Sequence, residues 1–223
     1  MVPRYCGTTV RTPQSSPATL AAYYGSIAGC PPDRPITSII LVEGPDLPLV
    51  GQLAPLIHDG DAIEFGNELE LAPWSLSRQQ YWDYEGHACQ VVLGGPNPAL
   101  PMVLGGVYTL DSEMAGWVRG AADTCPDATV DIHLYQPLTV ENLTFLRSMS
   151  KVIIGETGLP TRCDPSRDMA QLAFLQERRN ILSTIPSITA MLVYQWAVGP
   201  GCTDLDTFGI AGHSAETVLF PLP

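Results

Sequence analysis

The most constraining feature of the sequence is the alternation of short apolar segments with longer amphipathic segments. The apolar segments have the length and the Val- and Ile-rich composition of buried β-strands, whereas the amphipathic segments repeat with the period of helices. Strands that alternate with helices are joined by crossovers and run parallel, which predicts an α/β fold. The expected strands are residues 5–11, 38–44, 61–67, 90–95, 129–135, 151–156 and 188–196.

The expected helices fill the intervals between these strands. Ser16 followed by Pro17 is typical of a helix N-cap with proline at the first helical position, and Asp111 and Ser166 are suitable caps for later helices. No repeat, low-complexity tract or linker interrupts the pattern, so we expect one domain over residues 1–223. The expected helices are residues 16–29, 48–58, 77–90, 111–125 and 166–185.

The number of expected strands points to a TIM (β/α)8-type barrel that is short by one βα unit. Such a barrel has eight parallel strands, and the length of 223 residues lies toward the lower end of its usual range. The carboxyl ends of all strands converge on one face of a barrel, and the side chains there form the catalytic site.

Composition excludes two classes of partner. The formal net charge is −12, from 11 basic and 23 acidic residues, and such a surface repels the phosphates of nucleic acids while leaving neutral sugars acceptable. The longest apolar run, residues 188–198, is too short to span a bilayer. The N-terminus MVPRYCGTTV has no apolar stretch of a secretory signal, so secretion after removal of a signal and a cytoplasmic location both stay open.

The cysteines and histidines do not form a metal-binding pattern. Six cysteines are widely spread without a C-x-x-C pair, and four histidines occur without an H-E-x-x-H motif. The cysteines are compatible with one or two disulfides and equally with buried free thiols. We expect no metal site and no organic cofactor.

Polar side chains stand at the carboxyl ends of four expected strands. One strand ends in Asn67 and Glu68, another delivers His133 and Tyr135 to the same side by period-two alternation, and a third ends in Glu156. The last expected strand ends in Trp196. Two glutamates on one barrel face fit glycoside hydrolysis, which needs one carboxyl group as acid and another as nucleophile or base.

These motifs together resemble clan A of the glycoside hydrolases, the retaining (β/α)8 enzymes that include cellulases, mannanases, xylosidases and galactanases. In that clan the fourth strand ends in Asn-Glu, as at residues 67–68, and the seventh ends in the nucleophile, as Glu156 does in VIIGETG. Residues 90–95 and 129–135 then take the places of the fifth and sixth strands, and the first βα unit is the one absent.

The resemblance implies a role for each strand-end residue in a β-glycosidase that acts on an oligo- or polysaccharide. Glu156 is the expected nucleophile and Glu68 the expected acid/base, with Arg11 and Tyr135 holding Glu156 ionised. Asn67 is expected to bind the hydroxyl next to the reacting carbon. His133 and Trp196 are expected to orient the sugar and to form the floor of its subsite.

Simpler explanations stay open beside these roles. Glu68 could end a strand in solvent, Arg11 could form a structural ion pair, and Trp74 could either line an outer sugar subsite or pack on the next helix. Glu64 and Glu70 alternate with Glu68, but we expect Glu64 to lie too early in its strand to reach the rim and Glu70 to belong to the following loop.

Two other functions compete with the glycosidase. A non-catalytic carbohydrate-binding barrel, or an inactive remnant without its first strand, would bind sugars without turnover. An unrelated α/β enzyme would instead have an open sheet with its ligand at a topological switch point. The strand ends do not select among glucan, mannan, xylan, galactan and arabinan.

Overall fold

The computed structural model describes residue 6 and residues 9–33, 37–159 and 168–193. The chain forms two compact units, residues 1–131 and residues 132–223, which are considered in turn. Trp196 and the expected cap Ser166 lie outside the described residues.

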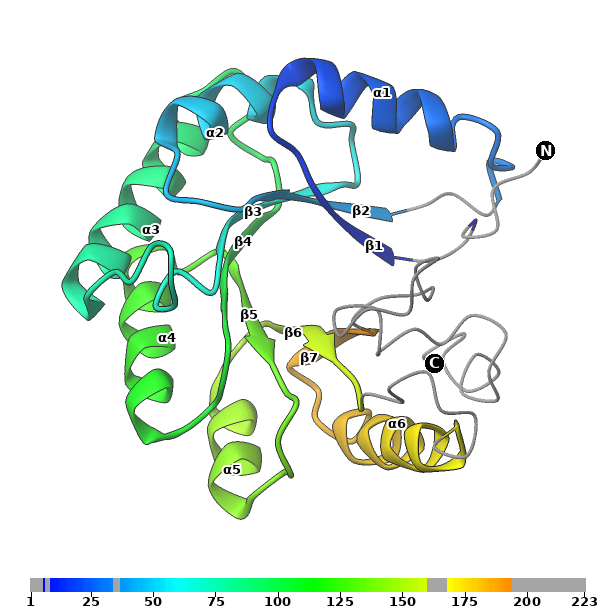
Figure 1. The fold of residues 1–223 in the computed structure, drawn as a ribbon. Coiled ribbons are helices and arrows are strands. Elements are labelled where there is room, and N and C mark those ends of the chain that lie inside the picture. Colours follow the sequence, from blue (N-terminus) through cyan, green and yellow to red (C-terminus); the bar gives the residue numbers. More distant parts are fainter. Residues whose placement is uncertain (1–5, 7–8, 34–36, 160–167, 194–223) are drawn as a thin grey trace. The chain divides into compact units, whose positions relative to one another are not determined.

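The first unit alternates strands and helices without interruption (Figure 1). Its elements are β1 (Thr9–Pro13), α1 (Pro17–Ile27), β2 (Thr37–Val42), α2 (Leu47–Leu53), a 3-10 turn η1 (Ala54–Leu56), β3 (Ala62–Asn67), α3 (Arg78–Leu93), β4 (Met102–Val107) and α4 (Ser112–Thr124). Strands β1 to β4 pair in parallel, each with the next along the chain. Helices α1 to α4 likewise pack in chain order, each against its successor.

The second unit continues the same alternation. Strand β5 (Thr129–His133) crosses the boundary between the units, and α5 (Val140–Ser148), β6 (Val152–Thr157), α6 (Asp168–Leu182) and β7 (Ile188–Val193) follow. The pairing of β6 with β7 is also parallel.

The strands follow chain order, β1-β2-β3-β4-β5-β6-β7, in one sheet. Parallel strands in sequence order with a helix in each crossover are the topology of a TIM (β/α)8-type barrel. The described part of the chain contains one βα unit fewer than the complete barrel, as the sequence predicted.

Local sequence explains where the helices begin. The Ser16 side chain accepts the Thr19 N–H and Thr19 reciprocates, so α1 starts with a capping box followed by proline, as predicted. Asp111 accepts two backbone N–H groups at the start of α4, which confirms the second predicted cap. Ser77 and Gln80 form another capping box at the start of α3.

Strands β2 to β6 are buried on both faces over most of their length, so their sequences read as mainly apolar runs rather than alternating ones. Strands β4 and β6 are buried at every position. Three charged or titratable side chains, Glu64, Asp131 and His133, are fully buried within β3 and β5. Burying such groups is costly unless they are paired, so these strands hold a polar network as well as a core.

The predicted strand at residues 90–95 is wrong, because these residues end α3 and begin the turn after it. Cys89 and Val92 lie on the buried face of that helix, and a short apolar run of this kind fits a helix end as well as a strand. The strand in this part of the sheet is β4, MVLGGV. The pattern did not predict it, because its two glycines and the prolines before it are typical of loops rather than strands. Helix α5 was also missed.

Two disulfides lie in the first unit. Cys6 bonds to Cys30, and Cys89 of α3 bonds to Cys125, the residue that ends α4. The disulfide alternative is therefore confirmed for four of the six cysteines, and Cys163 and Cys202 lie outside the described residues.

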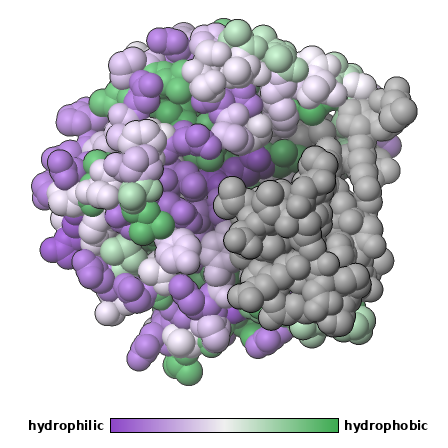
Figure 2. Space-filling model, in the orientation of Figure 1, coloured by the Kyte–Doolittle hydropathy of each residue, from purple (hydrophilic) through white to green (hydrophobic). Residues whose placement is uncertain are grey.

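The face seen in Figure 2 carries many polar residues at its rim. Hydrophilic residues, with scattered apolar ones, cover the rim over α2, α3 and α4 (Figure 2). Among the described helices, none has both the length and the apolar character needed to cross a membrane.

We predict opposite effects of adding a methyl group at two glycines. A Cβ at Gly105 in β4 would lie 2.4 Å from the Phe65 carbonyl oxygen and 2.9 Å from Glu85 Oε1, so Gly105→Ala should lower the free energy of unfolding by about 1–3 kcal/mol. Gly116 in α4 has no atom within 4 Å of the same position, so Gly116→Ala should raise it by roughly 0.5–1 kcal/mol. Urea unfolding of both variants measures this, and equal effects would contradict the packing at β4.

Candidate functional site

The turn after β3 places Asn67 and Glu68 at the carboxyl end of the strand. Gly66 has a φ of 93°, and a Cβ there would lie 2.5 Å from the Leu69 side chain. Glu68 also has a positive φ, 48°, and its N–H donates to the Gly106 carbonyl oxygen of β4 at 2.8 Å. The fully buried side chain of Leu69 packs beside Gly66 and holds the turn in the core. Backbone of this sparsely populated kind is held only where neighbouring structure imposes it.

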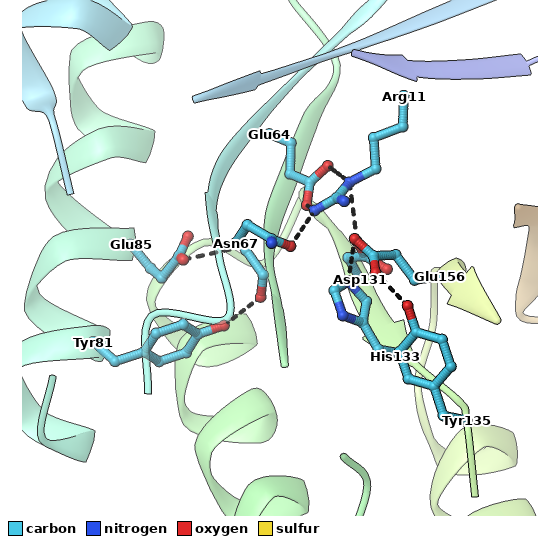
Figure 3. A network of polar contacts seen from close by, with 10 residues as sticks. Arg11, Glu64, Asn67, Tyr81, Glu85, Asp131, His133, Tyr135 and Glu156 are labelled. Atoms are coloured by element: carbon cyan, nitrogen blue, oxygen red, sulfur yellow. Dashed lines mark hydrogen bonds and ion pairs between the residues drawn. The ribbon is translucent and has the colours of Figure 1, made fainter. Parts of the chain in front are cut away.

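Arg11 of β1 joins three side chains of the first unit (Figure 3). Its Nε donates to Glu64 Oε2 at 2.6 Å and its Nη2 to Glu64 Oε1 at 2.7 Å, a two-pronged contact. The same Nη2 donates to Asn67 Oδ1 at 2.7 Å. Its Nε also lies 3.7 Å from Asp131 Oδ2.

The hydrogen bond from Arg11 fixes the orientation of the Asn67 amide. A guanidinium group has only donors, so the amide oxygen must face Arg11. The amide nitrogen of Asn67 then points away from Arg11 as a donor with a defined direction. A donor held in this way is suited to binding a hydroxyl or another acceptor at the strand end.

The charges of this cluster do not balance if every group is ionised. Glu64 and Asp131 are both fully buried, and one guanidinium lies beside two carboxyl groups. Burial raises the pKa of Glu64 to about 8, with Arg11 opposing the shift and Asp131 adding to it. The raised pKa of Glu64 favours a proton on this pair of carboxyl groups, which would reduce the net charge of the cluster.

Helix α3 supports the same region from the other side of the sheet. The Tyr81 hydroxyl donates to the Gly105 carbonyl oxygen at 2.8 Å, and Glu85 Oε1 accepts the Gly105 N–H at 3.1 Å (Figure 3). Both side chains are buried, and burial raises the pKa of Glu85 well above its ordinary value. The backbone of β4 that pairs with Asn67 is thus held by two side chains of one helix.

The second unit contributes Glu156, His133 and Tyr135. The Tyr135 hydroxyl donates to Glu156 Oε2 at 2.5 Å, and His133 Nε2 lies 3.7 Å from Glu156 Oε1 (Figure 3). The Glu156 side chain is 9% exposed and His133 is fully buried. Glu156 lies in β6, whereas Tyr135 follows the end of β5, so two strand ends meet at this carboxylate.

Backbone contacts position Tyr135 against β6. The Leu134 N–H donates to the Glu156 carbonyl oxygen at 2.9 Å, and the Thr157 hydroxyl donates to the Leu134 carbonyl oxygen at 2.7 Å. Leu134 is thus clamped on both of its backbone groups. The flanking side chains of His133 and Tyr135 are both directed to Glu156, as alternation along an extended chain requires.

The structure groups the predicted residues by unit. Arg11, Asn67 and Glu68 lie in the first unit, and His133, Tyr135 and Glu156 lie in the second. The expected subsite residue Trp196 lies outside the described residues.

Sequence reasoning missed the contribution of Glu64 and Asp131. Glu64 was set aside because it lies early in its strand, yet it binds Arg11 through both of its oxygens. The available signal was a single carboxylate inside an apolar strand, which implies a buried partner. Asp131 gave the same signal in TVDIH.

No protein-family model and no curated protein matches the chain. Its structure is similar to a family 39 glycoside hydrolase from Bacteroides cellulosilyticus, with a TM-score of 0.61 and 14% identity over 91% of this chain and 54% of that one. A GH5-4 broad-specificity endoglucanase from an uncultured bovine rumen ciliate gives a TM-score of 0.63 and 14% identity over 94% of this chain and 78% of that one. Bacteroides uniformis β-glucuronidase 2 gives a TM-score of 0.58 and 10% identity over 90% of this chain and 28% of that one.

These similarities establish the fold. The chain spans about half the length of the family 39 enzyme, 54%, and 28% of the β-glucuronidase. The three solved structures named above are glycoside hydrolases, and at this level of identity the similarity shows a shared fold.

We predict that Glu64 makes stability fall as pH rises. Between its unfolded pKa of 4.5 and its folded pKa of about 8, the folded protein holds the Glu64 proton that the unfolded chain has released. The free energy of unfolding should therefore decrease with rising pH across this window, and Glu64→Gln should remove that part of the slope. Urea unfolding from about pH 5.5 to about pH 8.5 measures this pH dependence of the free energy of unfolding. The whole range lies above the sequence pI of about 4.5, where the net charge keeps the protein in solution.

Asp131→Asn is the companion variant for this measurement. It removes the negative charge that raises the pKa of Glu64 and leaves Arg11 to favour the ionised form. The pH range over which the free energy of unfolding falls should then end at a lower pH than in the wild type. If the free energy of unfolding changed with pH in the same way for the wild type and Glu64→Gln, the raised pKa of Glu64 would be contradicted.

Proposed function

We propose that residues 1–223 act as a single catalytic domain, a retaining glycoside hydrolase that cleaves β-glycosidic bonds of an oligo- or polysaccharide. The contact of Tyr135 with Glu156 at the end of β6 carries the proposal, because it gives one nearly buried carboxylate a dedicated hydrogen-bond donor. The Asn67-Glu68 turn at the end of β3 and the fold shared with glycoside hydrolases support it.

In the first step Glu156 attacks the anomeric carbon of the bound sugar. A bond forms between its carboxylate oxygen and that carbon while the glycosidic carbon–oxygen bond breaks. Glu68 gives its proton to the departing oxygen, so the leaving group departs as an alcohol. The product of this step is a glycosyl-enzyme ester.

In the second step water replaces Glu156. The Glu68 carboxylate removes a proton from the water as the water oxygen attacks the anomeric carbon, and the ester bond to Glu156 breaks. Two inversions return the original β configuration. Such a mechanism requires the two carboxyl groups to lie about 5–5.5 Å apart.

The remaining residues position these two carboxyl groups and the sugar. Tyr135 donates to Glu156 Oε2 and fixes the orientation of that carboxyl group. Arg11 holds Asn67 so that its amide nitrogen donates to the hydroxyl next to the reacting carbon. His133 orients the sugar beside Glu156, and Trp196 forms the floor of its subsite.

Azide distinguishes the two glutamates by the product that it forms. In Glu156→Ala, azide enters the space left by the carboxylate and attacks opposite the leaving group, which should give the α-glycosyl azide. In Glu68→Ala the ester with Glu156 still forms from an activated aryl β-glycoside, and azide should displace it to give the β-glycosyl azide. Glu68→Ala should also slow substrates with poor leaving groups by about 10²–10⁴-fold.

The measurement is NMR analysis of products from a panel of aryl β-glycosides, with Glu113→Ala as the control. Glu113 is an exposed acidic residue in the first turn of α4, and its variant should behave as the wild type. A folded wild type that binds oligosaccharides but hydrolyses no substrate would overturn the proposal in favour of a carbohydrate-binding or inactive barrel.

A further inference from the structure

The loop that begins at Glu68 is internally hydrogen bonded up to the start of α3. The Leu71 N–H donates to the Glu68 carbonyl oxygen at 2.9 Å, and the Ser75 N–H donates to the Leu71 carbonyl oxygen at 2.7 Å. The Leu76 N–H returns to the Leu69 carbonyl oxygen at 2.8 Å. Residues 68–77 thus form a compact loop in which Glu68 and Trp74 are connected by a short chain of backbone contacts.

Trp74 is one of the few large apolar side chains that this unit exposes. It is 42% exposed, although a tryptophan gains most from burial. The covered part of its ring lies against Gly44, which follows β2: a Cβ at Gly44 would be 2.7 Å from the Trp74 Cζ2 atom. The Tyr84 hydroxyl, 3.2 Å from the Gly44 carbonyl oxygen, holds that glycine in place.

Trp74 packs on the loop after β2 at Gly44, and this contact leaves the ring partly in solvent. Only a residue without a side chain permits so close an approach. The ring is therefore fixed in position and still available to a ligand, which suits a platform for a sugar ring.

A second exposed aromatic residue is tied to the same loop. Tyr108 follows β4 and is 43% exposed, and its N–H donates to Glu70 Oε1 at 2.6 Å. Glu70 thus connects the loop of Trp74 to the end of β4. The region around Glu68 therefore presents two aromatic side chains on backbone that is cross-linked by hydrogen bonds.

We propose that Trp74 is the platform of a subsite for the sugar unit that leaves during the first step. The inference rests on the proposed function, in which Glu68 protonates the departing oxygen. Trp74 belongs to the loop that carries this acid, so the sugar attached to that oxygen is the one within its reach. The apolar face of a pyranose ring stacks on the indole, and the substrate is thus a chain of at least two sugar units rather than a simple glycoside.

The experiment compares two substrates that share the reacting sugar. One is a β-linked oligosaccharide, whose leaving group is a sugar, and the other is the matching β-glycosyl fluoride, whose leaving group is too small to reach Trp74. Trp74→Ala should lower kcat/KM for the oligosaccharide by about tenfold, mainly through KM, and change the fluoride by less than about twofold. Trp74→Phe should recover most of the loss.

Gly44→Ala tests the same platform without removing the tryptophan. The added methyl group would lie 2.7 Å from the indole and must displace it, so this variant should reproduce part of the loss for the oligosaccharide alone. Leu93→Ala is the control, because Leu93 is a 50% exposed apolar residue at the far end of α3. Circular dichroism and urea unfolding establish that each variant is folded.

The outcomes separate this inference from the proposed function. Equal losses for both substrates, or no loss for either, would overturn the Trp74 subsite while hydrolysis by the wild type still upholds the glycosidase. Calorimetric titration of oligosaccharide into Glu156→Ala, with and without Trp74→Ala, supplies a readout that does not need turnover. Unchanged affinity in the double variant would also overturn the inference.

Discussion

The bidentate contact of Arg11 with Glu64 is the interaction on which the polar cluster of the first unit depends. It fixes a guanidinium group inside the sheet, and this guanidinium in turn orients Asn67 and neighbours Asp131. Removing either partner of a buried pair leaves the other without compensation, so the arrangement tolerates little change. Burial raises the pKa of Glu64, so the protonation of this carboxyl group is coupled to the stability of the cluster.

Rigidity near the strand ends comes from contacts behind the sheet as much as from the site itself. Tyr81 and Glu85 hold Gly105 from α3, and the Cys89–Cys125 disulfide connects α3 to α4. Disulfides persist in oxidising compartments, so this support is best suited to a protein that works outside the reducing cytosol. The polar side chains at the strand ends and the side chains that hold the backbone behind them thus belong to different layers of the fold.

The topology and most of the polar strand ends could be predicted because each depends on a local pattern. VIIGET and AIEFGN read as buried strands that deliver a carboxylate, and the caps at Ser16 and Asp111 follow from side-chain chemistry. Strand β4 could not be located, since MVLGGV has weak strand propensity and QVVLGG imitates a strand at the end of a helix. The partner of Glu64 was also hidden, because 53 residues separate it from Arg11 and no local rule relates them.

Strand β5 carries two buried polar side chains two positions apart, one at the end of each unit. Asp131 lies beside Arg11, and His133 lies beside Glu156. The two side chains share one face of a single strand, with the buried Ile132 between them on the other. Neither polar side chain can be replaced by an apolar one without leaving a buried charged or titratable partner unmatched, so the TVDIH segment is constrained at both positions.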